Sequence, residues 1–120
     1  MARGLVLISV VAFAVSGALM VIVPGSMLGV VGVPADPNTE FLIRTEGIAL
    51  LFGAVVLWAI RDARPPAMRI VLLGLAGYYI LGATVDLAAY SEEIVGTASL
   101  PSAAIRIALG LACLVAIGRT

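Results

Sequence analysis

The chain has 120 residues, of which 62% are hydrophobic and only 12% are charged. A soluble domain carries about 45–50% apolar and about 25% charged residues, so this composition excludes an ordinary soluble globular protein. It also excludes a disordered chain, which requires low hydrophobicity and a high net charge. Seven arginines balance seven acidic residues, so we expect no basic surface and no nucleic-acid partner.

Motifs of common cofactor and nucleophile chemistry are missing from the sequence. It contains no histidine and a single cysteine, Cys113, so neither an internal disulfide nor a zinc site is expected. No phosphate-binding loop, nucleophile elbow or Cys-x-x-Cys pair occurs, and we expect no cofactor and no metal. Cys113 is interpreted as a packing residue, because no histidine is present to activate its thiol.

The first apolar segment has no charged residue between Gly4 and Ala35. Crossing the hydrocarbon core takes a helix of about 20 apolar residues, which residues 5–23 supply before Pro24-Gly25 ends the span. The rest of the segment, residues 26–33, is too short to cross and is predicted to form an interfacial turn or short helix. A cleaved signal peptide is the alternative for the first span, but the apolar run is too long and lacks a small-residue cleavage site.

Three further spans are predicted at residues 41–60, 68–90 and 101–117. Asn38 or Thr39 is expected to cap the second span, and Pro101 suits the first turn of the fourth. Short loops join the spans, including a charged loop that is closed by Pro65-Pro66. The sequence therefore predicts an all-α, integral membrane, four-helix up-down bundle that forms a single transmembrane domain over residues 1–120.

Arginine placement predicts the orientation of the spans, because cytoplasmic loops are enriched in positive charge. Arginines lie before the first span, between the second and third, and after the fourth: Arg3, Arg61, Arg64, Arg69 and Arg119. The other two loops carry acids only: Asp36, Glu40, Glu92 and Glu93. Both termini are therefore expected in the cytoplasm. The abundance of Ala, Gly, Val and Arg without Lys suggests a high-GC bacterial genome, hence a multi-pass protein of the bacterial inner membrane.

Four ionisable residues lie inside the predicted spans: Arg44, Glu46, Asp86 and Arg106. A charge at the centre of a membrane helix costs at least about 2.5–3.5 kcal/mol and is a functional hypothesis by default. At a rise of 1.5 Å per residue, Glu46, Asp86 and Arg106 lie roughly 6–9 Å inside the outer ends of their helices. We therefore expect all four charges to form one polar cluster in the outer half of the bundle.

Helix periodicity places small and polar residues on the same faces as these charges. Gly53 shares a face with Glu46, and Gly82 and Tyr79 share one with Asp86. The face of Arg106 includes Ser102, Gly110 and Cys113. On the first span, a comparable stripe consists of Ser9, Ala12, Ser16 and Met20. Because small residues mark packing faces in membranes, the charged faces are expected to point inward.

The catalytic hypothesis uses Glu46, Asp86 and Arg106. An apolar pocket favours the neutral form of one carboxyl group and an adjacent arginine the ionised form of the other, which would divide the acid and base roles. Candidate substrate-binding residues are Arg44, Tyr78, Tyr79, Tyr90 and Ser16. Arg44 has two interpretations: pairing with Glu40 or snorkelling near the surface, or membership of the cluster.

A purely structural interpretation of the charges stays open. An Asp86–Arg106 ion pair would hold the third and fourth spans together, and Glu46 would form a hydrogen bond to a tyrosine or a serine. Trp58 lies at the cytoplasmic end of its span, where tryptophan is an ordinary interface anchor.

The order Pro24, Gly29, Arg44-x-x-Gly47, Gly53 and Arg61-Asp62 resembles small bacterial four-span proteins of the DoxX-like group. This resemblance covers most of the chain and implies a four-helix membrane bundle. In architecture, four spans with paired acids in one half also look like the sterol-isomerase and emopamil-binding group. That likeness implies proton transfer on a lipophilic substrate.

Three functions follow as hypotheses. The first is a membrane enzyme that uses acid–base chemistry to isomerise, cyclise or open an epoxide in an isoprenoid- or sterol-like molecule. The second is an accessory subunit of a membrane complex that binds lipid or quinone. The third is a proton-coupled transporter that works as an oligomer. The expected partners are membrane lipid and a lipophilic small molecule, and a homodimer is kept as an alternative to a single copy.

Overall fold

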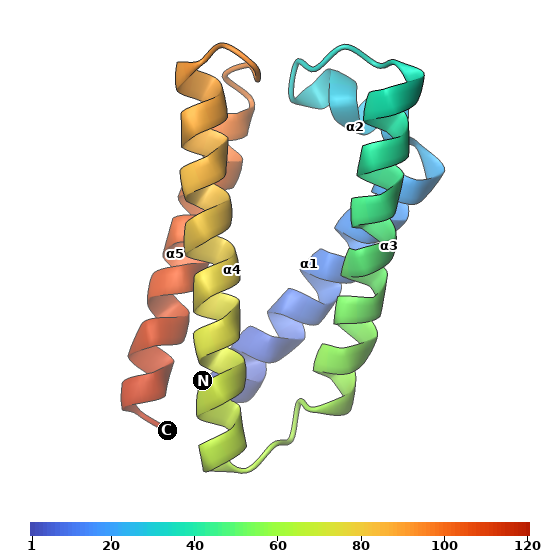
Figure 1. Ribbon diagram of the computed structural model, residues 1–120. Coiled ribbons are helices and arrows are strands. Elements are labelled where there is room, and N and C mark those ends of the chain that lie inside the picture. The colour runs from blue at the N-terminus through green and yellow to red at the C-terminus, as the bar shows by residue number, and fades with distance from the viewer.

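The computed structural model describes residues 1–120 and is all-helical (Figure 1). Its five helices are α1 (Ala2–Ile22), α2 (Pro24–Val30), α3 (Pro37–Ala59), α4 (Pro65–Ser91) and α5 (Ser99–Gly118). Helices α1, α3, α4 and α5 are each long and apolar enough to cross a membrane. A long apolar helix is therefore present at each of the four predicted spans, and the apolar segment after the first of them contains the short helix α2.

Three prolines begin helices where the sequence analysis placed loops or the end of a span. These first residues are Pro24 in α2, Pro37 in α3 and Pro65 in α4. Proline suits this position, because the first N–H groups of a helix have no partner within it. As a result α4 starts earlier than the predicted residue 68. Helix α5 also starts earlier than predicted, at Ser99 rather than near Pro101.

The N-terminus of α3 corrects the predicted cap. The capping residue is Asp36, whose carboxylate accepts hydrogen bonds from the N–H groups of Asn38 and Thr39, each at 2.9 Å. The Thr39 hydroxyl accepts the N–H of Asp36 at 3.0 Å, which completes a capping box. Pro37 takes the first helical position, so the cap lies before the expected Asn38 or Thr39, and Thr39 is its reciprocal partner.

The long helices pack as two pairs. Helix α1 lies along α3, and α4 lies along α5, whereas the consecutive helices α3 and α4 make no close backbone approach. Figure 1 shows the two pairs apart over most of the length of α3 and α4, with α1 crossing obliquely from the α4–α5 pair towards α3. The N- and C-termini and the α3–α4 loop lie at the same end of the molecule.

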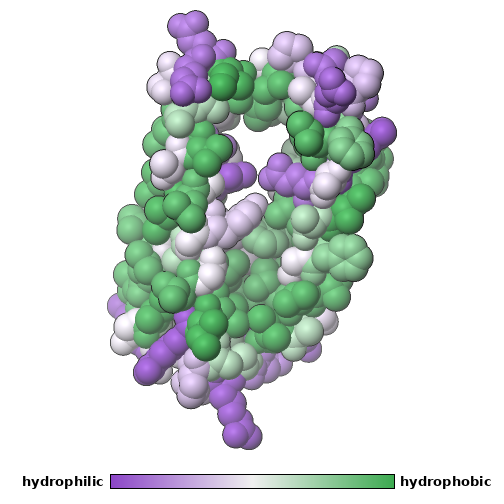
Figure 2. Space-filling view, viewed as in Figure 1, coloured by the Kyte–Doolittle hydropathy of each residue, from purple (hydrophilic) through white to green (hydrophobic).

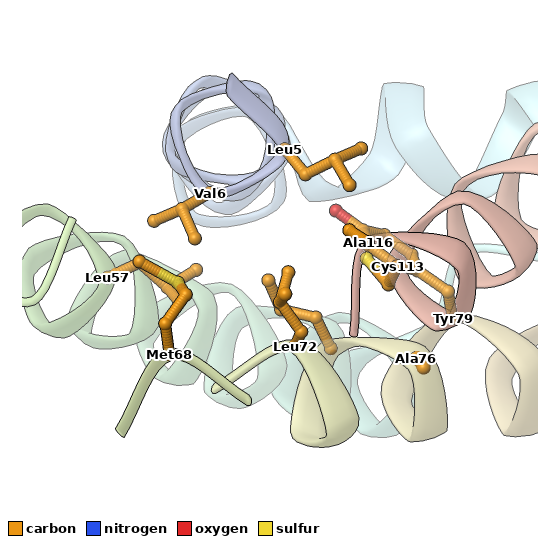
Figure 3. Packing of buried hydrophobic residues seen from close by; sticks show 10 residues of the cluster. Leu5, Val6, Leu57, Met68, Leu72, Ala76, Tyr79, Cys113 and Ala116 are labelled. Carbon is orange, nitrogen blue, oxygen red and sulfur yellow. The ribbon is translucent and has the colours of Figure 1, made fainter. Parts of the chain in front are cut away.

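The hydrophobic core is concentrated at the end that carries the termini. It combines side chains from all four long helices (Figure 3): Leu5, Val6, Leu57, Met68, Leu72, Leu75, Ala76, Tyr79, Cys113 and Ala116. A surface ion pair at this end joins Arg3 Nε to Asp62 Oδ1 at 2.7 Å. The four helices therefore meet where α1 and α4 begin and where α3 and α5 end.

The opposite end has a single backbone connection between the two pairs. The N–H of Gly96, in the α4–α5 loop, donates to the carbonyl oxygen of Val31 at 2.8 Å. Gly32 beside it has a φ of +77°, and a Cβ there would lie 3.1 Å from the Gly96 nitrogen. Glycine is needed at position 32 because other residues rarely adopt this backbone conformation.

The crossing of α1 and α3 depends on a second pair of glycines. A Cβ on Gly17 would lie 2.7 Å from the carbonyl oxygen of Gly47. A Cβ on Gly47 would lie 2.7 Å from Met20 Cβ and 2.8 Å from the Gly17 oxygen. Small residues allow membrane helices to approach this closely, and the resulting van der Waals packing drives their association.

We predict that Gly47→Ala lowers the stability of the protein in detergent by about 1–3 kcal/mol, because the added methyl group overlaps atoms of α1. The measurement is the midpoint of thermal unfolding. Gly77→Ala is the matched control, since a Cβ on Gly77 meets no atom within 4 Å, and alanine favours a helix more than glycine does. Equal midpoints for the two variants would contradict the role of Gly47.

Candidate functional site

A cavity separates the two helix pairs in the half of the molecule away from the core. We call it the central cavity; its volume is about 580 Å³. Figure 2 shows an opening through this half of the molecule, with hydrophilic side chains protruding from both walls. The lining residues are Met20, Met27, Val31, Ile43, Glu46, Tyr78, Leu81, Gly82, Val85, Asp86, Val95, Ser99, Ser102 and Arg106.

A neighbouring cavity of about 420 Å³ belongs to the same opening. It shares six lining residues with the central cavity: Met20, Met27, Val31, Tyr78, Ser102 and Arg106. Beyond them it reaches Ser16 of α1 and Tyr79 of α4. The opening is therefore accessible from the sides of the helix pairs and mixes apolar side chains with a few charged and hydroxyl groups.

One wall of the central cavity carries an ion pair between neighbouring helices. Arg106 Nη1 of α5 lies 3.5 Å from Asp86 Oδ2 of α4, and 28% and 27% of the respective side chains remain exposed. Gly82, one turn before Asp86, makes room for the arginine, because a Cβ there would lie 2.7 Å from Arg106 Nη1. The sequence analysis placed Gly82 and Asp86 on one face, and here both line the cavity.

Glu46 lines the same cavity from α3, which belongs to the other helix pair. Its carboxylate takes part in none of the side-chain hydrogen bonds or salt bridges of the structure. The hydrogen bond to a tyrosine or serine that the structural interpretation expected is therefore not formed. The cavity thus presents an unpaired carboxylate on one helix pair and an ion pair on the other.

Arg44 lies outside this cluster. It is exposed and does not line the central cavity. It also lacks the expected salt bridge to Glu40, because no such contact lies within 4 Å. Glu40 instead extends towards α2, where its Oε1 lies 3.4 Å from the position of a Cβ on Gly25. Residues 44 and 46 are two apart and so leave the helix in different directions.

The four predicted hydroxyl residues occupy different surroundings. Tyr78 lines the central cavity and packs against Phe13 with ring centroids 4.8 Å apart. Tyr79 is buried, and its hydroxyl shares a hydrogen bond of 2.6 Å with Ser9. Ser16 lines the neighbouring cavity. Tyr90 lines neither cavity and is partly exposed near the end of α4.

Several lining residues were not among the predicted site residues. Met27 and Val31 come from α2 and the loop after it, a segment assigned to the interface, and Ser99 lies before the expected start of its span. Ser102 and Met20 were recognised only as members of helix faces. The sequence signal that could have found Ser99 is the polar stretch before Pro101. In the structure Ser99 Oγ donates to the carbonyl oxygen of Gly96 at 2.8 Å.

Two residues set apart from the site lie at the core end of the molecule. Trp58 is exposed, and the guanidinium of Arg61 lies 3.9 Å from the centre of its ring. Cys113 is fully buried in the core. Neither side chain lines the central cavity.

No protein-family model matches the chain, and the comparisons with curated proteins and with solved structures gave no match. The resemblance to the DoxX-like group therefore stays a prediction. The chemistry of the cavity has to be argued from its own residues.

A double-mutant cycle on Asp86→Asn and Arg106→Gln measures what the ion pair contributes to stability. We expect a coupling energy of about 1 kcal/mol, near the low end of the range for contacting pairs, because both side chains are partly exposed. Glu46→Gln should change stability by less than about 0.5 kcal/mol, since this carboxylate has no partner to lose. Thermal unfolding in detergent is the measurement. A Glu46→Gln variant that unfolds as early as Asp86→Asn would place Glu46 in the ion-pair network.

Proposed function

We propose that the protein crosses the bacterial inner membrane four times, with both termini and the α3–α4 loop in the cytoplasm. The arginine distribution supports this orientation. Arg3 and Arg61 both contact Asp62 at the end that carries the termini. The opposite end carries the acidic residues of the α2–α3 and α4–α5 connections. In this orientation the central cavity lies in the outer half of the bilayer.

The ligand of the central cavity is a lipophilic molecule that enters from the bilayer. Large apolar side chains cover the outer surfaces of all four long helices, as expected for contact with lipid. The cavity opens sideways between the helix pairs, while the Gly96–Val31 hydrogen bond joins the pairs at the outer end. Access is therefore easier for a molecule dissolved in lipid than for one dissolved in water.

The reaction is acid–base chemistry on an isoprenoid- or sterol-like substrate. The observation that carries this proposal is the unpaired Glu46 carboxyl group across the cavity from the Asp86–Arg106 pair. Glu46 and Asp86 divide the acid and base roles between them, and Arg106 orients the carboxylate of Asp86. In an isomerisation one of these carboxyl groups protonates one carbon, the other removes a proton from another carbon, and the substrate keeps its composition. Cyclisation begins with the same protonation of carbon. In epoxide opening the acid protonates the epoxide oxygen, water adds to a ring carbon as the C–O bond breaks, and the base accepts the proton of that water.

A second candidate is an accessory subunit that holds a lipid or quinone without changing it. The lateral opening and the hydroxyl groups of Tyr78, Ser99 and Ser102 favour this candidate, because they fit an amphiphile with a polar head. A proton-coupled transporter would require an oligomer, since one copy has only four long helices. A homodimer is compatible with either of these alternatives.

The test of catalysis uses labelled water, so that the substrate need not be known. Protein in nanodiscs is incubated with a bacterial lipid extract in water labelled in both hydrogen and oxygen, and the lipids are analysed by mass spectrometry. Isomerisation or cyclisation fixes solvent deuterium on carbon, and epoxide opening fixes labelled oxygen. We expect Glu46→Gln and Asp86→Asn to reduce incorporation by about 10²–10⁴-fold, the usual contribution of a general acid or base.

Glu40→Gln is the matched control, because Glu40 lies on the same helix outside the cavity. It should label lipids at the rate of the unmodified protein. Full incorporation by both cavity variants would refute the catalytic proposal. Co-purification of one lipophile without any incorporation would favour the accessory subunit instead.

Cysteine labelling tests the orientation. In a Cys113→Ala background, a membrane-impermeant maleimide applied to intact cells should modify Ala98→Cys, before α5, and leave Ala67→Cys, at the start of α4, unmodified until the cells are permeabilised. Both alanines are exposed at opposite ends of the molecule. The reverse labelling pattern would show that the termini face outward.

A further inference from the structure

An apolar groove continues from the central cavity towards the core end of the molecule. It lies between α3 and α4, has a volume of about 370 Å³, and is lined by Phe13, Gly53, Val56, Val71, Gly74 and their apolar neighbours. Tyr78 lines both the central cavity and this groove, so the two spaces adjoin at its ring. The groove contains no charged side chain.

The two spaces together match the shape of a molecule with one polar end. Helix α3 contributes Glu46 to the central cavity and Val56 to the groove. These residues are ten apart, which corresponds to about 15 Å along a helix. A dodecyl chain is of about that length. A polar head beside Glu46 would therefore extend its tail past Tyr78 into the groove.

The charges of the central cavity indicate the sign of the head group. Three ionisable side chains other than tyrosine line it: Glu46, Asp86 and Arg106. Arg106 is compensated by Asp86 at 3.5 Å, whereas Glu46 is unpaired and the nearby Arg44 does not line the cavity. The lining thus has one uncompensated negative charge. In a partly desolvated space this charge favours a cation over a neutral group or an anion.

We propose that the site binds single-chain amphiphiles with a positively charged head group, the head beside Glu46 in the central cavity and the tail in the apolar groove. This inference rests on the proposed function, in which a lipophilic molecule occupies the cavity. It adds the charge of the head group, the direction of the tail, and Glu46 as the residue that selects a positively charged head.

Photo-crosslinking in nanodiscs whose lipids carry no net charge tests the proposal. The probe is dodecyltrimethylammonium with a diazirine at the end of its chain, and mass spectrometry locates the labelled residues. Two matched probes differ only in the head: the carbon isostere, in which carbon replaces the ammonium nitrogen, and the sulfonate. We expect the cation to label Val56 and Val71 about tenfold more than the isostere, with the sulfonate lowest.

Glu46→Gln should reduce labelling by the cation to the level of the isostere, whereas Glu40→Gln should leave it unchanged. Labelling of Ile8 and Val11 measures general contact with lipid, because these residues lie on the exposed side of α1. Equal labelling of the groove by all three probes, or preference for the sulfonate, would overturn the proposal while leaving lipophile binding intact. Labelling of the lipid-facing residues alone would overturn both proposals.

A pair of glycines on α4 tests the place of the tail. Gly74 lines the groove and Gly77 lines none of the cavities described, and a Cβ at either position meets no atom within 4 Å. Because its Cβ has room, Gly74→Phe should place an aromatic ring in the groove and lower labelling of Val56 by at least about fivefold. Gly77→Phe should not. Unchanged labelling in Gly74→Phe would exclude the groove as the position of the tail.

Discussion

Close approach at glycines determines which helices of this protein pair. Apolar helices gain no hydrophobic free energy by leaving lipid for one another, so they associate where small residues let their backbones approach. Gly17 and Gly47 meet at the α1–α3 crossing, and a Cβ on Gly110 of α5 would lie 2.6 Å from Ile80 Cγ1 of α4. No equivalent contact joins α3 to α4. The two tight pairs and the space between them therefore have the same cause.

Three of the four charges within the predicted spans lie beside that space: Glu46, Asp86 and Arg106. A charged side chain in lipid is costly unless it is paired or hydrated. Asp86 and Arg106 meet across one helix pair, and Gly82 leaves room for the guanidinium. Glu46 faces the cavity from the other pair without a partner. The ion pair has a structural explanation in the contact of α4 with α5, whereas Glu46 has none, and this difference makes Glu46 the residue on which both proposals depend.

Hydropathy and periodicity predicted the spans and the inward face of Asp86 and Arg106, because both are local properties of a helix. The cap of α3 was predicted at the wrong residue. The Asp36 carboxylate accepts the N–H groups of Asn38 and Thr39, and Pro37 between them begins the helix. The cavity itself was beyond prediction from the sequence. The cavity depends on which helices pair, and this is not a local property of the sequence. It also depends on the position of α2, whose Met27 lines it.

The distribution of packing separates stability from the site. Ten buried core residues join all four long helices at the end with the termini. The cavity lies beyond them and is closed at the end away from the core by the single backbone contact of Gly96 with Val31. Because elements with few buried contacts open at low free-energy cost, the helix pairs can part at that end while the core stays packed. The chain can in this way keep an open space between its helix pairs without sacrificing the contacts that keep it folded.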